Sequence, residues 1–545
     1  MVNYSAALAF VFCLIAANVI AQDRYAVHYK FKPGAIYSLE QPESWLSQKA
    51  LLRRDRDKVL LDSTDLPVAD KYVETLSAFV NDFIFHSKWL NASIVHASSA
   101  EIKHIAALDF VSAVILVAKG GPSSLESSTK NYKSKRKKKR LKKSRETSNF
   151  SFQNSVLGIS DMHNAGYTGE GVLVAIFDAG FLNVDKIPAF DHLFEGNKIA
   201  ATKDFVLAGS TTVFRADTHG TGTLSLMAAY DPKNLIAGAY GANYILCITE
   251  DVDSEYRIEE YNWVRAVEFA DSLGVDVINS SLGYNFFDDP KMNYSKEDLD
   301  GETAIITKGA NMAAEKGILV VSSAGNEGNI SWKTITVPAD AKGIIAVGAV
   351  NRNFEKAGFS SVGPSIDERI KPELVAYGTG VTLWRQEEGT SSSSGTSFSA
   401  PQVAALAAGL REANPDWTNK ELRDQLLLSG SQYSDPDNEL GYGIPDFTRA
   451  MFGRFDKKGD PEKSNVARIY PNPLIADQLL VEFGVSTYCT MKLYSSNGKV
   501  ISEHDLERTG NNFPYSVNMK LLNPGIYLVE LQDDSTVSKV KLWKK

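Results

Sequence analysis

The feature that most limits the fold is a regular alternation of short apolar segments with amphipathic ones between residues 150 and 452. Three of the apolar segments are short and rich in β-branched residues, as buried strands are: residues 172–177, 275–278 and 318–321. Residues 258–273 and 302–316 have the spacing of helices. Strands that alternate with helices form a parallel sheet covered on both faces. We therefore expect an α/β, doubly wound architecture with three layers.

An apolar run over residues 6–21 precedes polar Gln22 and is typical of a secretory signal peptide, which we place at residues 1–21. The residues before the run include no Lys or Arg, so a buried N-terminal helix is the alternative. No other stretch approaches the roughly 18 continuous apolar residues that a membrane span needs. We expect an exported protein with no integral membrane segment once the signal is removed.

The three cysteines do not form the pattern of a disulfide framework. Cys13 would leave with the signal peptide, whereas Cys247 and Cys489 lie in different expected domains. So few cysteines fit an exported protein that relies on a large core.

A basic segment separates the N-terminal part from the α/β region. Eleven Lys or Arg and no acidic residue occur from Lys130 to Arg145, which leaves 47 basic against 66 acidic side chains elsewhere, a net charge of −19. Such a run cannot bury its charges, so we expect a solvated, protease-accessible linker over residues 130–149. Nuclear targeting or nucleic-acid binding is the alternative, and export argues against both. We also hypothesise that this linker is cut during maturation, so that the next domain begins near Ser148.

The part before the basic linker, residues 22–129, contains a pattern of strand, helix and strand, as a small α+β domain does. We expect these elements at residues 94–96, 100–108 and 111–118. The α/β region extends over residues 150–455 and is followed by a second linker over residues 456–465.

Residues 466–545 contain short alternating strands separated by Pro, Gly and Asn turns. This is the pattern of a small β-sandwich. We expect its strands at residues 479–483, 490–494, 499–503, 526–531 and 537–542.

Asp178 and His219 are candidate site residues in the α/β region. Asp178 ends an expected strand, and ligands bind outside the carboxyl ends of strands in open α/β sheets, although a lone carboxylate there is commonly a turn former or helix cap. His219 opens a Gly-rich segment before an expected helix, and an imidazole can act as general base when its second nitrogen donates to a buried carboxylate. Asp217 is nearer to His219 in sequence, but a bond between the two would hold the imidazole against its own loop. We therefore do not assign Asp217 a catalytic role.

Ser397 and Asn326 complete the candidate set. Ser397 lies just before an expected helix over residues 400–413 that has Pro401 in its first turn. Free N–H groups at a helix N-terminus favour the negative charge of a tetrahedral intermediate, whereas a helix cap is the alternative role for this serine. Asn326 follows an expected strand and can donate its amide to an oxyanion; a turn-forming Asn is the alternative.

In order and local context these four residues resemble the catalytic residues of subtilisin-like serine peptidases. The matching segments are Gly166 to Val172, Asp178 to Gly180, His219 to Thr223, Asn279 to Gly283, Ser322 to Gly328 and Gly395 to Pro401. The resemblance implies a triad of Asp178, His219 and Ser397, with Asn326 in the oxyanion site. Ala179 departs from the family, which usually has Ser or Thr there, so one hydroxyl contact near the Asp carboxylate is expected to be missing.

The same resemblance implies a substrate-binding role for five further residues. In the family, the segment matching Ser281, Leu282 and Gly283 offers its backbone to an extended substrate, which is strand addition. That segment, with Ala324 and Gly325, also forms a wall of the specificity pocket.

The flanking domains carry further resemblances. Residues 22–129 resemble, by their place in the chain, the prodomain that assists folding and blocks the cleft in these enzymes; a non-inhibitory binding domain is the alternative. About the last eighty residues resemble the C-terminal sorting domain of the type IX secretion system, through Ile469 to Pro473, Leu493 to Lys499 and Pro524 to Val529. A carbohydrate-binding or adhesive sandwich is the alternative. Type IX sorting implies a protein that is secreted or on the cell surface of a Gram-negative bacterium.

Together these expectations describe a secreted serine endopeptidase that acts on polypeptides through an acyl-enzyme, with its own prodomain and the type IX machinery as partners. Nucleic acid is not an expected partner, and no organic cofactor is required. No residue is assigned to a metal, because scattered Asp and Asn leave structural calcium possible without a contiguous ligand loop. The alternatives are a catalytically silent surface or adhesive protein on the same scaffold, and an esterase with the same triad.

Overall fold

The computed structural model describes residues 22–33, 39–80, 82–120, 150–452, 468–470, 472, 474, 477–482, 488–507, 515–533 and 537–544. These residues form two compact units. The first holds the described residues of Met1–Ile36, Pro67–His86 and Asn91–Lys143, and the second holds those of Tyr37–Leu66, Ser87–Leu90 and Ser144–Lys545. The expected signal peptide at residues 1–21 and the expected linkers at 130–149 and 456–465 lie outside the described residues.

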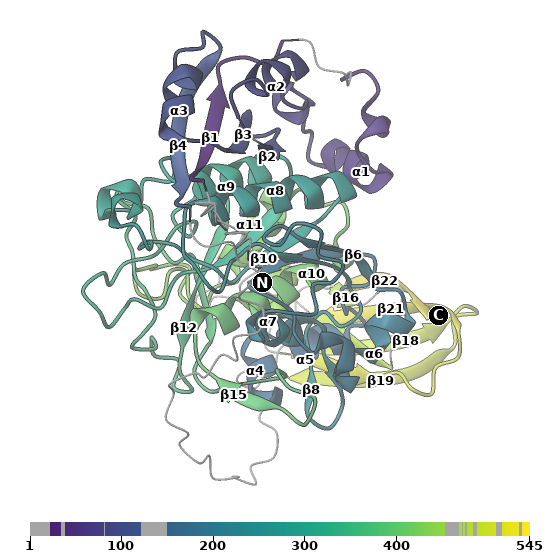
Figure 1. The fold of residues 1–545 in the computed structure, drawn as a ribbon. Coiled ribbons are helices and arrows are strands. Elements are labelled where there is room, and N and C mark those ends of the chain that lie inside the picture. Colours follow the sequence, from purple (N-terminus) through teal and green to yellow (C-terminus); the bar gives the residue numbers. More distant parts are fainter. Residues whose placement is uncertain are drawn as a thin grey trace, which may run out of the picture. The chain divides into compact units, whose positions relative to one another are not determined.

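The first unit is built on a four-stranded sheet in the order β2, β3, β1, β4, with β1 antiparallel to both of its neighbours (Figure 1). Its elements are β1 (Arg24–Tyr29), α2 (Asp70–Leu76), β2 (Asp82–Ser87), β3 (Ala92–His96), α3 (Ser99–Ala106) and β4 (Val111–Ala118). Helix α3 begins at a capping box in which Ser98 and Glu101 each accept the other's backbone N–H. The predicted strand, helix and strand are confirmed as β3, α3 and β4.

The second unit contains a seven-stranded sheet in the order β13, β12, β11, β10, β5, β9, β6, and every neighbouring pair is parallel. Its strands are β5 (Leu173–Asp178), β6 (Ile199–Asp204), β9 (Asn243–Ile248), β10 (Val277–Ser280), β11 (Leu319–Ser323), β12 (Ile345–Val350) and β13 (Leu374–Tyr377). From β5 the chain first adds strands on one side (β6 and β9) and then on the other (β10 to β13). The carboxyl ends of parallel strands form binding sites at such a switch point.

Helices cover both faces of this sheet. α8 and α9 pack on each other and on β5 and β11, whereas α7 and α10 pack on each other and on β5, β10 and β11. Figure 1 shows the two pairs on opposite sides of the strands. The predicted three-layer α/β architecture is therefore confirmed.

The boundaries of the helices agree closely with the sequence patterns. The helices of the second unit are α1 (Gln48–Arg56), α4 (Phe150–Val156), α5 (Ile159–Asn164), α6 (Asp191–Glu195), α7 (His219–Ala228), α8 (Ile258–Leu273), α9 (Ile305–Glu315), α10 (Ala400–Ala413), α11 (Asn419–Leu428) and α12 (Phe447–Phe452). α9 begins three residues later than residue 302, because the Asp300 carboxylate accepts the N–H groups of Glu302 and Thr303 and folds them into a turn.

Two further pairs of short strands flank the α/β core: β7 (Tyr230–Asp231) with β8 (Leu235–Ile236), and β14 (Val381–Leu383) with β15 (Ser391–Ser393). No helix within the described residues is both long enough and apolar enough to cross a membrane.

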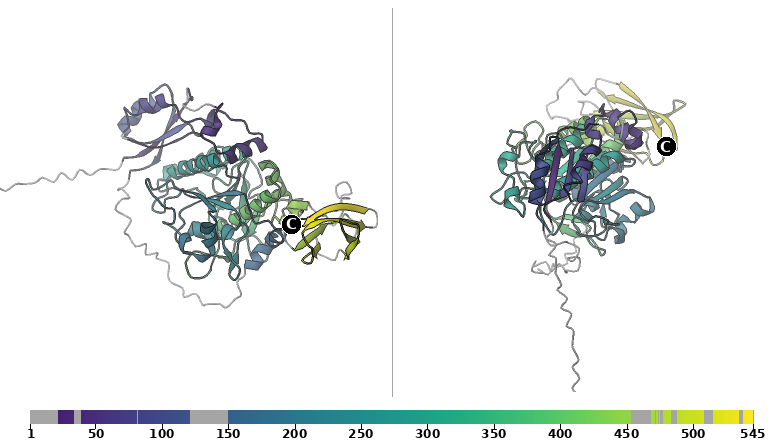
Figure 2. Two further views of the ribbon diagram at one scale, coloured as in Figure 1. Left: turned by 90° about the vertical axis from the view of Figure 1, so that its right-hand side faces the viewer. Right: turned by 45° about the horizontal axis from the view of Figure 1, so that its top comes forward.

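The C-terminal region consists of two antiparallel sheets, drawn in yellow tones in Figure 2, with strand orders β16, β17, β20 and β19, β18, β21, β22. Its strands are β16 (Arg468–Tyr470), β17 (Gln478–Glu482), β18 (Tyr488–Ser495), β19 (Val500–Glu507), β20 (Tyr515–Asn518), β21 (Gly525–Asp533) and β22 (Val537–Lys544). Buried side chains from both sheets, among them Leu479, Met491 and Val529, form one core. This is the predicted sandwich, with β16 and β20 added to the five strands that were expected.

Candidate active site

Asp178 is the last residue of β5 and is completely buried. Its Oδ1 accepts hydrogen bonds from the Ala179 N–H and from His219 Nδ1, each at 2.8 Å, and its Oδ2 accepts one from the Thr223 hydroxyl at 3.1 Å. The Thr223 hydroxyl also lies 3.0 Å from the Gly220 carbonyl oxygen, so the two acceptors share its single proton. The three contacts together hold this buried carboxylate in one orientation.

His219 begins α7, which approaches the end of β5 closely because residue 220 is glycine. A Cβ on Gly220 would lie 2.3 Å from the Gly180 carbonyl oxygen and 2.9 Å from the Asp178 Cβ. Asp217 accepts the His219 backbone N–H at 2.6 Å, so it binds the start of the helix and not the ring. The imidazole is left to pair with Asp178, and 28% of its side chain is exposed.

The pairing with Asp178 sets the proton affinity of the ring. Burial alone would lower the pKa of His219, but the charge and hydrogen bond of Asp178 more than offset this, so the pKa is raised above its ordinary 6.5. Because Nδ1 donates to the carboxylate, Nε2 is the nitrogen that can accept a proton. The pair therefore has the geometry of a general base with its orienting carboxylate.

Ser397 lies in the 3₁₀ helix Thr396–Phe398, which leads into α10, and it is 8% exposed. Its hydroxyl donates to the Ser281 carbonyl oxygen at 3.2 Å and not to His219. Such catalytic contacts often form only when substrate is bound. The ring of the next residue, Phe398, packs on the His219 ring with the centroids 5.6 Å apart. The structure thus brings the serine into the neighbourhood of the Asp178 and His219 pair.

The backbone around Ser397 has an open donor. Among the described residues no acceptor pairs with the Ser397 N–H, as is usual for the first N–H groups of a helix. This N–H is therefore available to an oxyanion.

Asn326 is exposed, three residues beyond the end of β11. Its Oδ1 accepts the backbone N–H of Thr396 at 2.9 Å and the Thr396 hydroxyl at 3.1 Å. Because the Thr396 N–H binds the oxygen of the amide, Nδ2 is the atom that can donate, next to the residue that precedes Ser397. The role of Asn326 as an oxyanion donor stays a prediction.

The segment Ser281–Gly283 follows β10 and is bonded to the serine loop. The Ser281 hydroxyl donates to the Ser397 carbonyl oxygen at 3.0 Å, in addition to the bond from the Ser397 hydroxyl described above. Leu282 is buried, whereas Gly283 is exposed. The segment thus lies beside Ser397, with its third residue open to solvent.

Ala324 and Gly325 follow β11, the strand next to β10. Both main-chain groups of Ala324 are used within the protein, since its N–H donates to the Val347 carbonyl and its carbonyl accepts the Thr336 N–H. The Gly325 carbonyl oxygen lies 3.2 Å from the Thr396 hydroxyl and shares the single hydroxyl proton with Asn326 Oδ1. All five residues therefore follow neighbouring strands of the sheet, but Ala324 and Gly325 are buried, and their expected role in substrate binding stays a prediction.

Thr223 is a residue that the sequence interpretation did not single out. Its hydroxyl supplies to Asp178 the kind of contact that Ala179 cannot make. Residues four apart lie on the same face of a helix, so the spacing of His219 and Thr223 on α7 is the signal that could have identified it.

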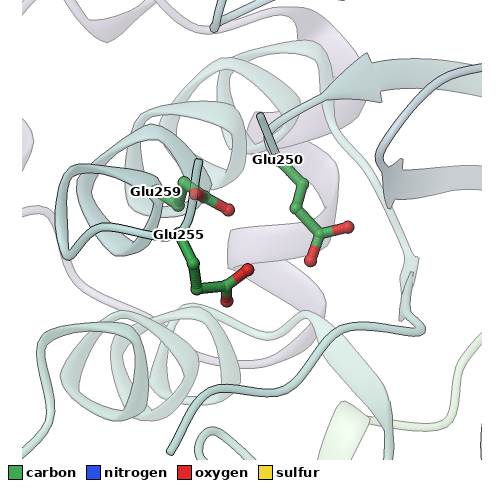
Figure 3. Close-up of side chains that lie close together, drawn as sticks. All are labelled: Glu250, Glu255 and Glu259. Atoms are coloured by element: carbon green, nitrogen blue, oxygen red, sulfur yellow. The ribbon is translucent and has the colours of Figure 1, made fainter. Parts of the chain in front are cut away.

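Three acidic side chains that the sequence interpretation also missed, Glu250, Glu255 and Glu259, point toward one another (Figure 3). Their carboxylate oxygens lie within 4.8 Å of one another. Burial and the nearby Asp178 charge raise the pKa of Glu250 to about 8, and burial also raises that of Glu255, to about 7, and that of Glu259. In the part of the chain that the structure describes, no further feature marks a ligand at this cluster, so we assign it no metal and structural calcium stays a prediction.

Three families match successive parts of the chain. The subtilase family, Peptidase S8, matches residues 169–443, about half of the chain. The Peptidase S8 propeptide domain of Bacteroidota matches residues 24–138, and a secretion system C-terminal sorting domain matches residues 468–545. The propeptide and sorting domains agree with a protein that a Gram-negative bacterium secretes or carries on its surface.

Subtilisin of Bacillus pumilus is 30% identical over 269 residues, which cover 49% of this chain and 86% of that protein. Subtilisin NAT of Bacillus subtilis subsp. natto is 30% identical over 269 residues, and the match covers 62% of its length. The chain thus spans less than two thirds of subtilisin NAT.

Two solved structures are similar at lower identity. The prenylagaramide maturation protease PagA is 21% identical with a TM-score of 0.43, covering 54% of this chain and 97% of that one. MycP1 with its N-terminal propeptide removed is 24% identical with a TM-score of 0.44, and the match covers 57% of this chain and 99% of the MycP1 chain. The family match over half of the chain and the 30% identity to nearly the whole of the Bacillus pumilus subtilisin decide the assignment: this chain belongs to the subtilase family.

Proposed function

We propose that this protein is a secreted serine endopeptidase that hydrolyses peptide bonds through an acyl-enzyme. The observation that carries the proposal is the 2.8 Å bond between His219 Nδ1 and the buried Asp178 carboxylate at the carboxyl end of β5. The serine of the 3₁₀ helix Thr396–Phe398 lies in the same neighbourhood. The chain also belongs to the subtilase family and is 30% identical to two Bacillus subtilisins over 269 residues.

In the proposed reaction Ser397 leaves the Ser281 carbonyl and attacks the substrate carbonyl, while His219 Nε2 takes the hydroxyl proton. Asp178 holds the ring in the required tautomer and stabilises the imidazolium. The imidazolium then gives its proton to the leaving amine, and the acyl group stays on Ser397. Water, activated by the same ring, hydrolyses the acyl-enzyme and frees the serine.

The tetrahedral intermediates carry a negative oxygen, which Asn326 Nδ2 and the Ser397 N–H would stabilise. Both donors are fixed before substrate arrives, Asn326 through the bond from the Thr396 N–H and the Ser397 N–H by the start of the helix. No organic cofactor takes part in these steps.

The proposed substrates are polypeptides that lie in extended form along the segment Ser281–Gly283. The propeptide domain and the type IX secretion machinery are the proposed partners of the whole protein, in line with the propeptide and sorting domains.

Hydrolysis of a mixed peptide pool by the Ser397→Ala variant tests the proposal. Folded Ser397→Ala protein should cleave peptides several orders of magnitude more slowly than the wild type. Unchanged hydrolysis would overturn the assignment. A competition between extended peptides and small esters separates a peptidase from an esterase with the same triad, because a peptidase should prefer the peptides.

A further inference from the structure

One helix within the propeptide match belongs to the same compact unit as the α/β core. This is α1, which lies in the segment Tyr37–Leu66, and it contacts α8 (Figure 1). The interaction surface on the core is formed by the C-terminal ends of α8 and α9 and by the residues that directly follow them.

The centre of the contact is Asp271, in the last turn of α8 and completely buried. Arg54 donates from Nη2 to both of its oxygens, at 3.1 and 2.9 Å, and also binds Asp65 at 3.0 and 3.2 Å. Arg53 donates to the same Asp271 carboxylate. The negative end of the helix dipole destabilises a carboxylate near a helix C-terminus. The two arginines supply the positive charge that stabilises the Asp271 carboxylate there.

Arg53 also satisfies main-chain groups beyond the ends of both core helices. Its Nη1 donates to the Val275 carbonyl at 2.8 Å, and its Nε donates to the Lys316 carbonyl at 3.3 Å. Only 1% of the Arg53 side chain is exposed. One side chain thus caps both helix ends, as cations near C-terminal carbonyls do.

Lys316 extends the network from the core side. Its Nζ donates to Asp65 Oδ1 and to the Thr64 hydroxyl, both at 2.9 Å. The contact therefore joins Asp271 and Lys316 of the core to Arg53, Arg54 and Asp65 of the segment, so each side supplies charges that the other neutralises.

The shape of the core surface also fits this helix. A Cβ on Gly274 would lie 2.6 Å from the Ala50 backbone nitrogen, so only glycine allows α1 to come this close. Beside it, the Ser47 N–H donates to the Ser272 carbonyl at 2.8 Å. At the other end of α1, Asp57 accepts the backbone N–H of Asn419.

We propose that the ends of α8 and α9 form a binding site for the segment Tyr37–Leu66, and that this segment stays on the core as a separate bound peptide after the rest of the propeptide is cut away. The arginine pair Arg53 and Arg54 is its anchor. The proposal goes beyond the peptidase activity and does not depend on it.

The test uses the full chain with Ser397→Ala, cleaved by added endoproteinase Glu-C, so that no step needs the protein's own activity. Glu43 and Glu74 are exposed, and no Glu lies between them, so cleavage produces the fragment Ser44–Glu74 with the anchor intact. We expect this fragment to elute with the core in size-exclusion chromatography under native conditions and to separate from it in denaturant. A core particle without the fragment would overturn the proposal.

Asp271→Asn in the same background should weaken binding of the fragment roughly hundredfold or more, because one partner of a buried charge network is removed. Asp55→Asn is the matched control, since Asp55 lies on α1 with 85% of its side chain exposed and should leave retention unchanged. If Asp271→Asn does not fold, Asp65→Asn tests the same network from the segment. Full retention in a folded anchor variant would contradict the role of the arginine pair.

Discussion

The Thr223 hydroxyl donates to Oδ2 of Asp178 at 3.1 Å, while His219, one turn earlier on the same helix, binds Oδ1. A single helix, α7, therefore carries the proposed base and one of the groups that fix its orienting carboxylate. Through this contact a hydroxyl reaches Asp178 from α7, although residue 179 is Ala.

Replacing this threonine should change the proton affinity of the base. In Thr223→Val the Asp178 carboxylate loses a donor, becomes more basic and stabilises the imidazolium more strongly, so the pKa of His219 should rise further. The acid limb of kcat/KM should move to higher pH, and stability should fall by about 1–2 kcal/mol.

Thr221→Val is the control for that change. Thr221 is a buried hydroxyl on the same helix, but it donates to the Leu182 carbonyl and not to Asp178. It should cost similar stability and leave the pH profile in place. An identical pH profile of kcat/KM for wild type and Thr223→Val would contradict an effect of Thr223 on the pKa of His219.

The pH dependence of the wild type follows from the raised pKa of His219. The ring must be neutral to accept the serine proton, and a raised pKa keeps it protonated to higher pH. The kcat/KM profile should therefore rise with a midpoint above 6.5. In Asp178→Asn the carboxylate no longer offsets the effect of burial on the pKa of His219, so the midpoint of the kcat/KM profile should fall. The same change should lower kcat about 10⁴-fold, as it does in known triads. A wild-type midpoint below 6.5 would argue against the ion pair.

Asn326→Ala should lower kcat by about 10²–10³-fold, a magnitude taken from subtilisin itself, with little change in KM. The reason is that the amide acts on charge that develops only in the transition state. Steady-state kinetics on one peptide substrate measure the split. A rise in KM at constant kcat would instead assign Asn326 to substrate binding.

The cluster of Glu250, Glu255 and Glu259 should make the fold sensitive to alkaline pH. The pKa values of Glu250 and Glu255 in the folded protein lie above the ordinary 4.5, so the folded state holds these protons more tightly than the unfolded state. The contribution of the protonated cluster to folding stability is therefore complete below about pH 4.5 and is lost as the pH rises through 7 and 8. Glu255→Gln should then raise stability at pH 8 by about 1–3 kcal/mol, and much less at pH 5. Thermal unfolding at the two values measures this, and equal effects at both would contradict it.

The sequence predicted those parts of the fold that depend on local pattern. The apolar run that ends at Asp178 and the helices at residues 258–273 and 400–413 have the predicted bounds or nearly so, because periodicity and flanking residues define them. The start of α9 was wrong by three residues, because a single capping carboxylate decided it.

The candidate site was predicted from motifs whose members lie far apart in the chain, and what the sequence missed are contacts between segments. The bond of Thr223 to Asp178 joins residues 45 apart, and the Glu250 cluster joins the residues after β9 to the start of α8. The Glu cluster depends on how the connection between β9 and α8 folds. The bond of Thr223 to Asp178 depends on tertiary packing, which a local pattern does not contain. The buried network of Arg53 and Arg54 has the same origin, since its partner Asp271 lies more than 200 residues away.

The central claim is that Ser397 is an activated nucleophile, and labelling with a fluorophosphonate probe tests it most directly. The wild-type protein, freed of its propeptide, should be labelled at Ser397, with the site identified by mass spectrometry of the digested protein. Labelling should disappear in Ser397→Ala and fall sharply in His219→Ala. A folded wild-type protein that stays unlabelled, or that is labelled at another residue, would contradict the account.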